Sequence, residues 1–262
     1  MSGTLPTPQS HPAIFPGVVS WALGRPELRP PYPEEIIVPA RPKILVFDVN
    51  ETLSDMAPMA GRFEEVGATA ADARLWFTAL LRDGFALTAA GGWESFTEVG
   101  RVALHPVLAG RTLNRTHEAA ADHIIAGVAE LPLHPDVAPG LRRLHAVGYP
   151  LVTLTNGSVA TSSALLTRAG VAELFTRMLS VNEPRVWKPG RAAYYYAAEV
   201  CEVAPADMML VAVHPWDIDG AARAGLSTAW INRGTADYPG YLAPPTEIAA
   251  GMGELAALLE SR

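Results

Sequence analysis

The sequence predicts an α/β protein with a doubly wound parallel sheet and an inserted helical cap. Four short apolar runs recur along the chain, each followed by polar residues. Helix-like stretches lie between them, at about 159–169, 190–202 and 217–224. This alternation is typical of a parallel sheet with right-handed crossovers. About 100 residues separate the first two runs, which is too long for a simple crossover and indicates an insertion.

The four apolar runs are the predicted core strands. Lys43–Val49 is nearly all apolar and ends around an aspartate, as expected of a strand buried on both faces. The other three runs are Tyr149–Thr155, Met208–Val213 and Ser227–Ile231. Because ligands of open parallel sheets bind beyond the carboxyl ends of the strands, polar residues at those ends are candidate site residues.

The remaining segments complete the predicted domain organisation. Residues 62–133 are dominated by helix formers and are expected to form the cap, within a catalytic core made of 41–61 and 134–262. Residues 1–40 are rich in proline and lack a helical or strand period, which predicts an N-terminal arm or tail. Thr246–Leu259 is expected to be a C-terminal helix capped by its threonine.

Composition narrows the function classes. The chain has 262 residues, 49% of them hydrophobic, so a large packed core is easily supplied. No apolar run approaches the roughly 18 residues of a membrane span, and the N-terminus lacks a signal-peptide pattern. A net charge of −7 without a basic block argues against nucleic acid as a partner. The single cysteine suits a reducing compartment. We therefore expect a cytoplasmic protein with a small-molecule substrate and no membrane or nucleic-acid partner.

Polar residues at the strand ends form an ordered set. Asp48 lies at the end of the first run, Thr155 and Asn156 at the end of the second, and Asp217 after the third. Lys188 lies in a separate loop. An aspartate, a hydroxyl–amide pair, a lysine and a second aspartate in this order are more specific than any one of them.

These residues stand in motifs that resemble those of the haloacid dehalogenase (HAD) superfamily. Phe47–Leu53 is similar to its first motif, Thr155–Gly157 to the second, Lys188–Pro189 to the third and Trp216–Ala221 to the fourth. The resemblance covers roughly residues 41–235. It implies a HAD-like Rossmannoid core beneath the cap.

Two departures from the superfamily pattern indicate the chemistry. Most members are phosphatases, which carry an acid two residues after the nucleophile to protonate the leaving group. This chain has Asn50 there, and an amide is not an acid. The phosphatases also hold Mg²⁺ with an aspartate at the position of Val213. The resemblance is therefore to the (S)-2-haloacid dehalogenase branch, and it implies carbon–halogen hydrolysis without a metal or other cofactor.

The resemblance also implies roles for the motif residues. Asp48 would attack the carbon that bears the halogen, and water would then hydrolyse the ester formed on this aspartate. Thr52 and Lys188 would hold the nucleophile, and Asp217 would lie near the lysine and the water. The residues expected to bind substrate are Thr155, Asn156 and Tyr194. The expected substrates are short 2-haloalkanoic acids, as their L-enantiomers, converted to 2-hydroxy acids. A homodimer is common among such proteins.

Three further positions, His214, Ala212 and Phe77, depart from the familiar dehalogenases. His214 stands where they have asparagine, and Ala212 where they have serine. The change at His214 comes with a second one, Glu51, three residues after the nucleophile. Our hypothesis is that His214 takes the proton of the hydrolytic water while Glu51 orients the imidazole. The competing interpretation of Glu51 is a glutamate favoured at a first helical turn by the helix dipole. Phe77 stands at the position of the family's halide-binding cap arginine, so we expect it to border the substrate, with Arg82 as the alternative cation.

Two other functions remain open at this stage. One is a Mg²⁺-dependent phosphatase of the same superfamily, and the other is a non-catalytic binding protein that retains the fold. The remaining histidines lack metal-ligand spacing, and we interpret them as surface or packing residues. They are His105, His117, His123, His134 and His145.

Overall fold

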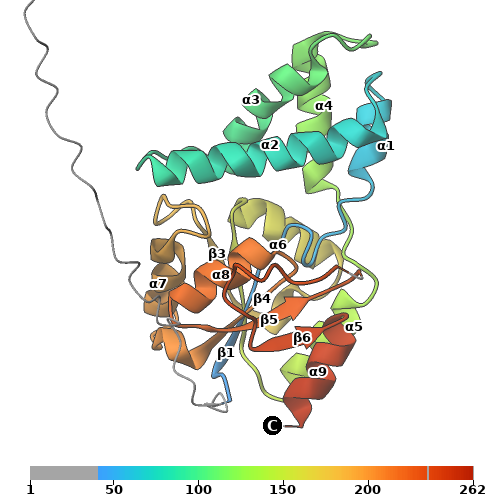
Figure 1. Ribbon diagram of the computed structural model, residues 1–262. Coiled ribbons are helices and arrows are strands. Elements are labelled where there is room, and N and C mark those ends of the chain that lie inside the picture. The colour runs from blue at the N-terminus through green and yellow to red at the C-terminus, as the bar shows by residue number, and fades with distance from the viewer. Residues whose placement is uncertain (1–40, 235, 262) are drawn as a thin grey trace, which may run out of the picture. The chain divides into compact units, whose positions relative to one another are not determined.

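The computed structural model describes residues 41–234 and 236–261 (Figure 1). The predicted N-terminal arm, 1–40, lies outside the described residues. Within this part of the chain the sheet has six strands, all parallel, in the order β3-β2-β1-β4-β5-β6. The strands are β1 (Ile44–Phe47), β2 (Leu151–Thr155), β3 (Phe175–Ser180), β4 (Met208–Ala212), β5 (Ser227–Ile231) and β6 (Glu247–Ala249). The predicted fold class is confirmed.

Helices cover both faces of this sheet. Three of them contribute to the apolar cluster on one face: α5 (Val137–Ala146), α6 (Val159–Arg168) and α9 (Met252–Glu260). The other face is covered by α7 (Arg191–Val200) and α8 (Pro215–Arg223). The central strands β1, β2 and β4 are buried along their whole length, which explains their continuous apolar sequences.

Strand register brings the candidate residues to one edge of the sheet. Phe47, the last residue of β1, pairs with Thr153 of β2 and with Val211 of β4. Asp48 therefore leaves its strand beside the last residues of both neighbours. In parallel strands these carboxyl ends share one edge, as a ligand site of an open sheet requires.

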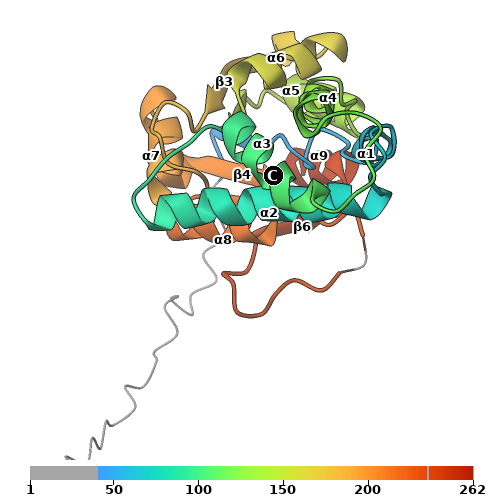
Figure 2. The ribbon, with the colours of Figure 1, turned by 90° about the horizontal axis from the view of Figure 1, so that it is seen from above.

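Four helices lie between β1 and α5 in the sequence and form their own apolar core. They are α1 (Met59–Glu64), α2 (Ala70–Ala89), α3 (Phe96–Leu108) and α4 (His117–Ala129). They lie together above the sheet and its helices in Figure 1, and Figure 2 shows them from above. Residues of α3 and α4 line a cavity with Val49 and Asn50, which follow β1. The contact with the core includes Trp187, whose ring stacks on Phe96 with centroids 5.9 Å apart and whose Nε1 donates to the Glu94 carbonyl at 2.9 Å.

The structure corrects two expectations at the sheet edges. The predicted helix Thr246–Leu259 is wrong at its start, because Glu247–Ala249 forms β6 against β5 and the helix begins only at Met252. The Thr246 hydroxyl accepts the Thr228 N–H at 3.1 Å and so joins the strands instead of capping the helix. β3 was not predicted, since it is an edge strand whose first residues are largely exposed. In the described residues, no helix is both long and apolar enough to cross a bilayer.

Candidate active site

Asp48 is fixed at the end of β1 by contacts to both its backbone and its side chain. Its N–H donates to the Val211 carbonyl at 3.1 Å, which continues the β1–β4 ladder. The Thr52 hydroxyl donates to Asp48 Oδ2 at 2.7 Å. That hydroxyl in turn accepts the Val213 N–H at 3.1 Å, which orients its proton toward the carboxylate. The side chain of Asp48 is 4% exposed, so the nucleophile candidate lies in a nearly dry site.

Lys188 lies between two carboxylates. Its Nζ donates to Asp48 Oδ1 at 2.9 Å and to Asp217 Oδ2 at 2.6 Å, and its side chain is fully buried. The Tyr194 hydroxyl donates to Asp217 Oδ1 at 2.6 Å. The structure therefore brings together five of the predicted residues, from the loop after β1, from the loop before α7, and from α7 and α8.

Burial and the neighbouring charges shift the pKa values of Asp48, Lys188 and Asp217. Burial alone would raise the pKa of Asp48, but Lys188 and His214, with the Thr52 hydrogen bond, hold that pKa below its ordinary value. Burial would lower the pKa of Lys188, yet Asp217 and Asp48 raise it. Burial raises the pKa of Asp217, and the neighbouring Asp48 charge acts in the same direction. Asp48 is therefore an ionised carboxylate beside an ionised lysine, as a nucleophile requires.

The second motif holds the lysine loop in place. The Lys188 N–H donates to Asn156 Oδ1 at 2.9 Å, and Asn156 Nδ2 donates back to the Lys188 carbonyl at 3.2 Å. Thr155 Oγ1 accepts the Gly157 N–H at 2.9 Å. Asn156 and Tyr194 thus have structural partners within the site, and their contact with substrate stays a prediction.

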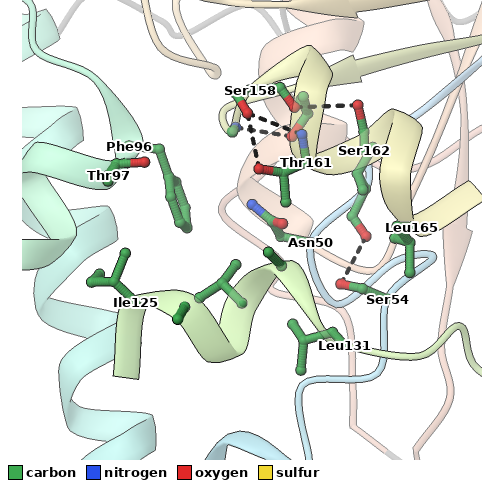
Figure 3. A pocket seen from close by; sticks show the side chains of 16 residues that line it. Asn50, Ser54, Phe96, Thr97, Ile125, Leu131, Ser158, Thr161, Ser162 and Leu165 are labelled. Atoms are coloured by element: carbon green, nitrogen blue, oxygen red, sulfur yellow. Dashed lines mark hydrogen bonds between the residues drawn. The ribbon is translucent and has the colours of Figure 1, made fainter. Parts of the chain in front are cut away.

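A cavity of about 260 Å³ adjoins the nucleophile loop, between α6 and the cap helices α3 and α4 (Figure 3). Asn50 points into it from the nucleophile loop, opposite Phe96 and Ile125 of the cap. Thr155 also lines it. The walls combine apolar side chains with hydroxyl and amide groups, which suits a small, partly polar ligand.

His214 lies at the N-terminus of α8 and faces the nucleophile loop. Its Nε2 is 3.6 Å from Asp48 Oδ2, 3.6 Å from Glu51 Oε2 and 3.2 Å from the Asn50 carbonyl oxygen. The ring stacks on Trp216, with centroids 4.9 Å apart. Histidine and glutamate are thus adjacent, as the hypothesis requires, and their catalytic roles stay predictions.

Glu51 does not lie in a helix. Its φ is 61°, in the left-handed region, and the next helix begins only at Met59. The interpretation of Glu51 as a helix-dipole residue is therefore wrong. Its N–H donates to Ser54 Oγ at 3.3 Å, and its carbonyl lies 3.0 Å from His134 Nε2. Burial raises the pKa of Glu51, opposed by His214 and reinforced by Asp48.

Sequence reasoning missed His134 and Trp216 as neighbours of the site. His134 follows the cap and lies 83 positions from Glu51, so no spacing rule connects them. The only available signal was position, because His134 begins the return from the cap to the core. Trp216 lies within the fourth motif, but its stacking on His214 depends on the turn at the start of α8.

Phe77 and Arg82 lie on the same cap helix but in different surroundings. Phe77 is 7% exposed and lines a pocket of roughly 590 Å³ together with Glu51 and Arg74. Arg82 is 69% exposed and pairs with Asp83 at 2.8 Å, so the alternative that it reaches the site is wrong. Phe77 as a substrate contact stays a prediction.

Two comparisons with known protein sequences find relatives of this chain. The family model for haloacid dehalogenase-like hydrolases matches residues 42–225. (S)-2-haloacid dehalogenase H-109 of Pseudomonas putida is 27% identical over 213 residues, which is 80% of this chain and 95% of that protein.

Solved structures agree with the sequence comparison. The structure of a dehalogenase with an intermediate complex has a TM-score of 0.78 and 27% identity, covering 85% of this chain and 99% of that one. L-2-haloacid dehalogenase of Xanthobacter autotrophicus with covalently bound chloropropionic acid has a TM-score of 0.76 and 25% identity, covering 83% and 98%. With most of its length matched by the family model, the chain belongs to the haloacid dehalogenase-like hydrolases.

Proposed function

We propose that this protein hydrolyses the carbon–halogen bond of short 2-haloalkanoic acids, as their L-enantiomers, and releases 2-hydroxy acids. Proteins named (S)-2-haloacid dehalogenase and L-2-haloacid dehalogenase match the chain over most of its length. The observation that carries the proposal is the setting of Asp48. Lys188 holds one oxygen of this ionised carboxylate and Thr52 the other, and no acid stands two residues later. A halide leaving group needs no proton, so Asn50 at that position is no handicap.

In the first step, a carboxylate oxygen of Asp48 attacks the carbon that carries the halogen, from the side opposite that halogen. A carbon–oxygen bond forms, the carbon–halogen bond breaks, and the halide leaves with the electron pair. The site is prepared for this step because the carboxylate is oriented by two donors and nearly removed from water. The product is an ester of Asp48.

In the second step, water attacks the ester carbonyl carbon of Asp48, and the His214–Glu51 pair activates that water. His214 Nε2 lies 3.6 Å from Asp48 Oδ2, whereas Lys188 Nζ bonds the other oxygen, Oδ1. Lys188 stabilises the carboxylate that is regenerated, and Asp217 with Tyr194 keeps the lysine in place. Asp48 returns to its ionised form as the hydroxy acid departs.

The substrate carboxylate and chain are placed near the end of β2. We assign the cavity of about 260 Å³ to the substrate chain, with Thr155 and the adjoining backbone near the substrate carboxylate. Phe77 supplies an apolar wall where relatives have a cation, and Arg74 is the cation that lines the same pocket of roughly 590 Å³.

The phosphatase alternative predicts a different requirement. It needs Mg²⁺ beside Asp48, held by hard oxygen ligands. Here Val213 stands at the position of the metal-binding aspartate, and Lys188 Nζ already bonds Asp48 Oδ1. We therefore expect halide release that is unchanged by a chelator. Chelator-sensitive release of phosphate from a phosphate ester would support the alternative.

A single turnover in ¹⁸O-labelled water, with enzyme in excess over L-2-chloropropionate, tests the proposal. We expect the label in the side chain of Asp48 and unlabelled oxygen in the hydroxy acid, because the carboxylate supplies the first oxygen. Label that appears at once in the hydroxy acid would mean direct attack by water. A non-catalytic binding protein would release no halide under any condition.

A further inference from the structure

We propose that the Glu51 carboxylate, and not the His214 ring, accepts the proton of the hydrolytic water, with His214 acting as a hydrogen-bond donor. The inference rests on the proposed ester route, and it exchanges the two roles that the sequence suggests. Three structural features support it: the contacts of the histidine nitrogen, the setting of the glutamate carboxylate, and the backbone that carries the glutamate.

A single nitrogen of His214 faces all three groups on the nucleophile side. Nε2 lies 3.2 Å from the Asn50 carbonyl oxygen and 3.6 Å from both Asp48 and Glu51. A carbonyl oxygen only accepts hydrogen bonds, so Nε2 carries a hydrogen in this contact. In a neutral ring the lone pair is then on Nδ1. The nitrogen nearest the ester is therefore a donor and has no lone pair to take a proton from water.

Glu51 offers what the histidine nitrogen lacks. Its Oε2 lies 3.6 Å from that nitrogen, so the carboxylate is a close neighbour of the donor and keeps its lone pairs free for a water. Burial raises its pKa and makes it a stronger base, while His214 and His134 oppose the rise and Asp48 adds to it. Its side chain is 41% exposed and lines two pockets of roughly 860 and 590 Å³. Water can reach this carboxylate, and a proton can leave from it.

The backbone of Glu51 is held in place for this task. A left-handed φ of 61° is unfavourable for a residue with a side chain, and such conformations persist where the surroundings fix them. Ser54 accepts the N–H of Glu51, and His134 donates to its carbonyl at 3.0 Å. His134 is thus a positioning residue, which acts on the reaction through Glu51.

The step balances as a hydrolysis. The water oxygen bonds to Cγ of Asp48 as one water proton passes to Glu51. The bond between Cγ and the substrate oxygen then breaks, and the proton that remained on the new hydroxyl passes to the departing alkoxide. Asp48 is again a carboxylate, and Glu51 releases its proton to solvent.

Two isosteric or near-isosteric variants separate the roles. Glu51→Gln removes the base but keeps the size, and His214→Gln keeps an N–H donor at about the reach of Nε2 but has no basic nitrogen. In single turnovers with L-2-chloropropionate, halide release reports ester formation, and the mass of the intact protein reports ester loss. We expect ester hydrolysis to slow about 10²–10⁴-fold in Glu51→Gln and less than about tenfold in His214→Gln. Halide release should change only a few-fold in both.

The double variant and a rescue experiment complete the test. The double variant should hydrolyse the ester as slowly as Glu51→Gln alone. Glu51→Gly should regain ester hydrolysis when formate is added, which a structural defect would not do. Hydrolysis that slows as much in His214→Gln as in Glu51→Gln would overturn the inference, and so would a Glu51→Gln protein with an unchanged rate. Absence of halide and ester from the unmodified protein would instead refute the proposed function.

Discussion

The groups on the two sides of Asp48 differ in their burial and in the distances between them. On one side Lys188, Asp217 and Tyr194 are fully buried and joined by hydrogen bonds of 2.6 to 2.9 Å. On the other side His214 and Glu51 approach only to 3.6 Å, and Glu51 is 41% exposed. The dry side fixes a charged nucleophile that must act without water. The open side leaves space for the water that the second step consumes.

The largest effect is expected from Asp48→Asn, because the amide is a far poorer nucleophile than the carboxylate. Halide release should fall at least about 10³-fold, and no ester should appear by mass spectrometry. Asp207→Asn is the matched control, since Asp207 pairs with an exposed lysine away from the site. A variant at position 48 that retains halide release would assign the nucleophile elsewhere.

Lys188→Met should be the most destabilising change on the dry side. It leaves the carboxylates of Asp48 and Asp217 buried without their cation, which typically costs about 3–5 kcal/mol of unfolding free energy. Lys43→Met removes a lysine that is 66% exposed and should leave stability nearly unchanged. Urea unfolding of both variants measures the contrast. Equal stability of the two would mean that the buried lysine is not charged.

Lowering the pH should slow ester hydrolysis before it slows ester formation. Ester formation needs ionised Asp48, whose pKa lies below its usual 3.8. Ester hydrolysis needs ionised Glu51, whose pKa is raised above its usual 4.5. As the pH falls, hydrolysis should therefore decline first, by about tenfold per unit below the Glu51 pKa. Mass spectrometry of enzyme quenched at falling pH should show accumulating ester. Glu51→Gln should lack this acid limb.

Tyr194→Phe should have a smaller effect. It removes the hydroxyl that donates to Asp217 at 2.6 Å and leaves a buried carboxylate oxygen with one partner fewer. The expected loss of stability is about 1–3 kcal/mol, with a several-fold lower rate of turnover. Tyr195→Phe is the control, because Tyr195 is the next residue in the chain and is 47% exposed. Equal losses of stability and turnover in the two variants would mean that the hydrogen bond from Tyr194 to Asp217 has no special importance.

The residues at the carboxyl ends of the central strands are the part of the site that the sequence could predict. Asp48, Thr155 and Asp217 follow apolar runs that are recognisable as buried strands, and parallel topology brings strand ends together. The edge strands β3 and β6 could not be predicted in this way. Their half-exposed sequences lack the continuous apolar character of the central strands.

The open side depends on features that carry no sequence period. Glu51 owes its place to a left-handed backbone, and His134 reaches it from a loop beyond the cap. The proximity of His214 and Glu51 was predicted from their motif positions. Sequence positions do not tell which histidine nitrogen faces the glutamate, and this detail changes the assignment of the base.

The smallest expected effect has the opposite sign to the others. Glycine adopts a left-handed φ without the steric cost that a side chain incurs, so Glu51→Gly should stabilise the fold by up to about 1 kcal/mol. The same change removes the carboxylate and should leave the ester on Asp48 nearly unhydrolysed. Urea unfolding and single-turnover mass spectrometry measure the two effects in one protein.

Gly91→Ala, at a φ of 76° in an exposed turn of the cap, is the reciprocal control and should destabilise by a similar amount without slowing hydrolysis. A gain in stability together with a loss of hydrolysis would mean that the backbone strain at Glu51 is retained for the second chemical step. A stable Glu51→Gly protein that still hydrolyses the ester would show instead that the open side of the site works without this carboxylate.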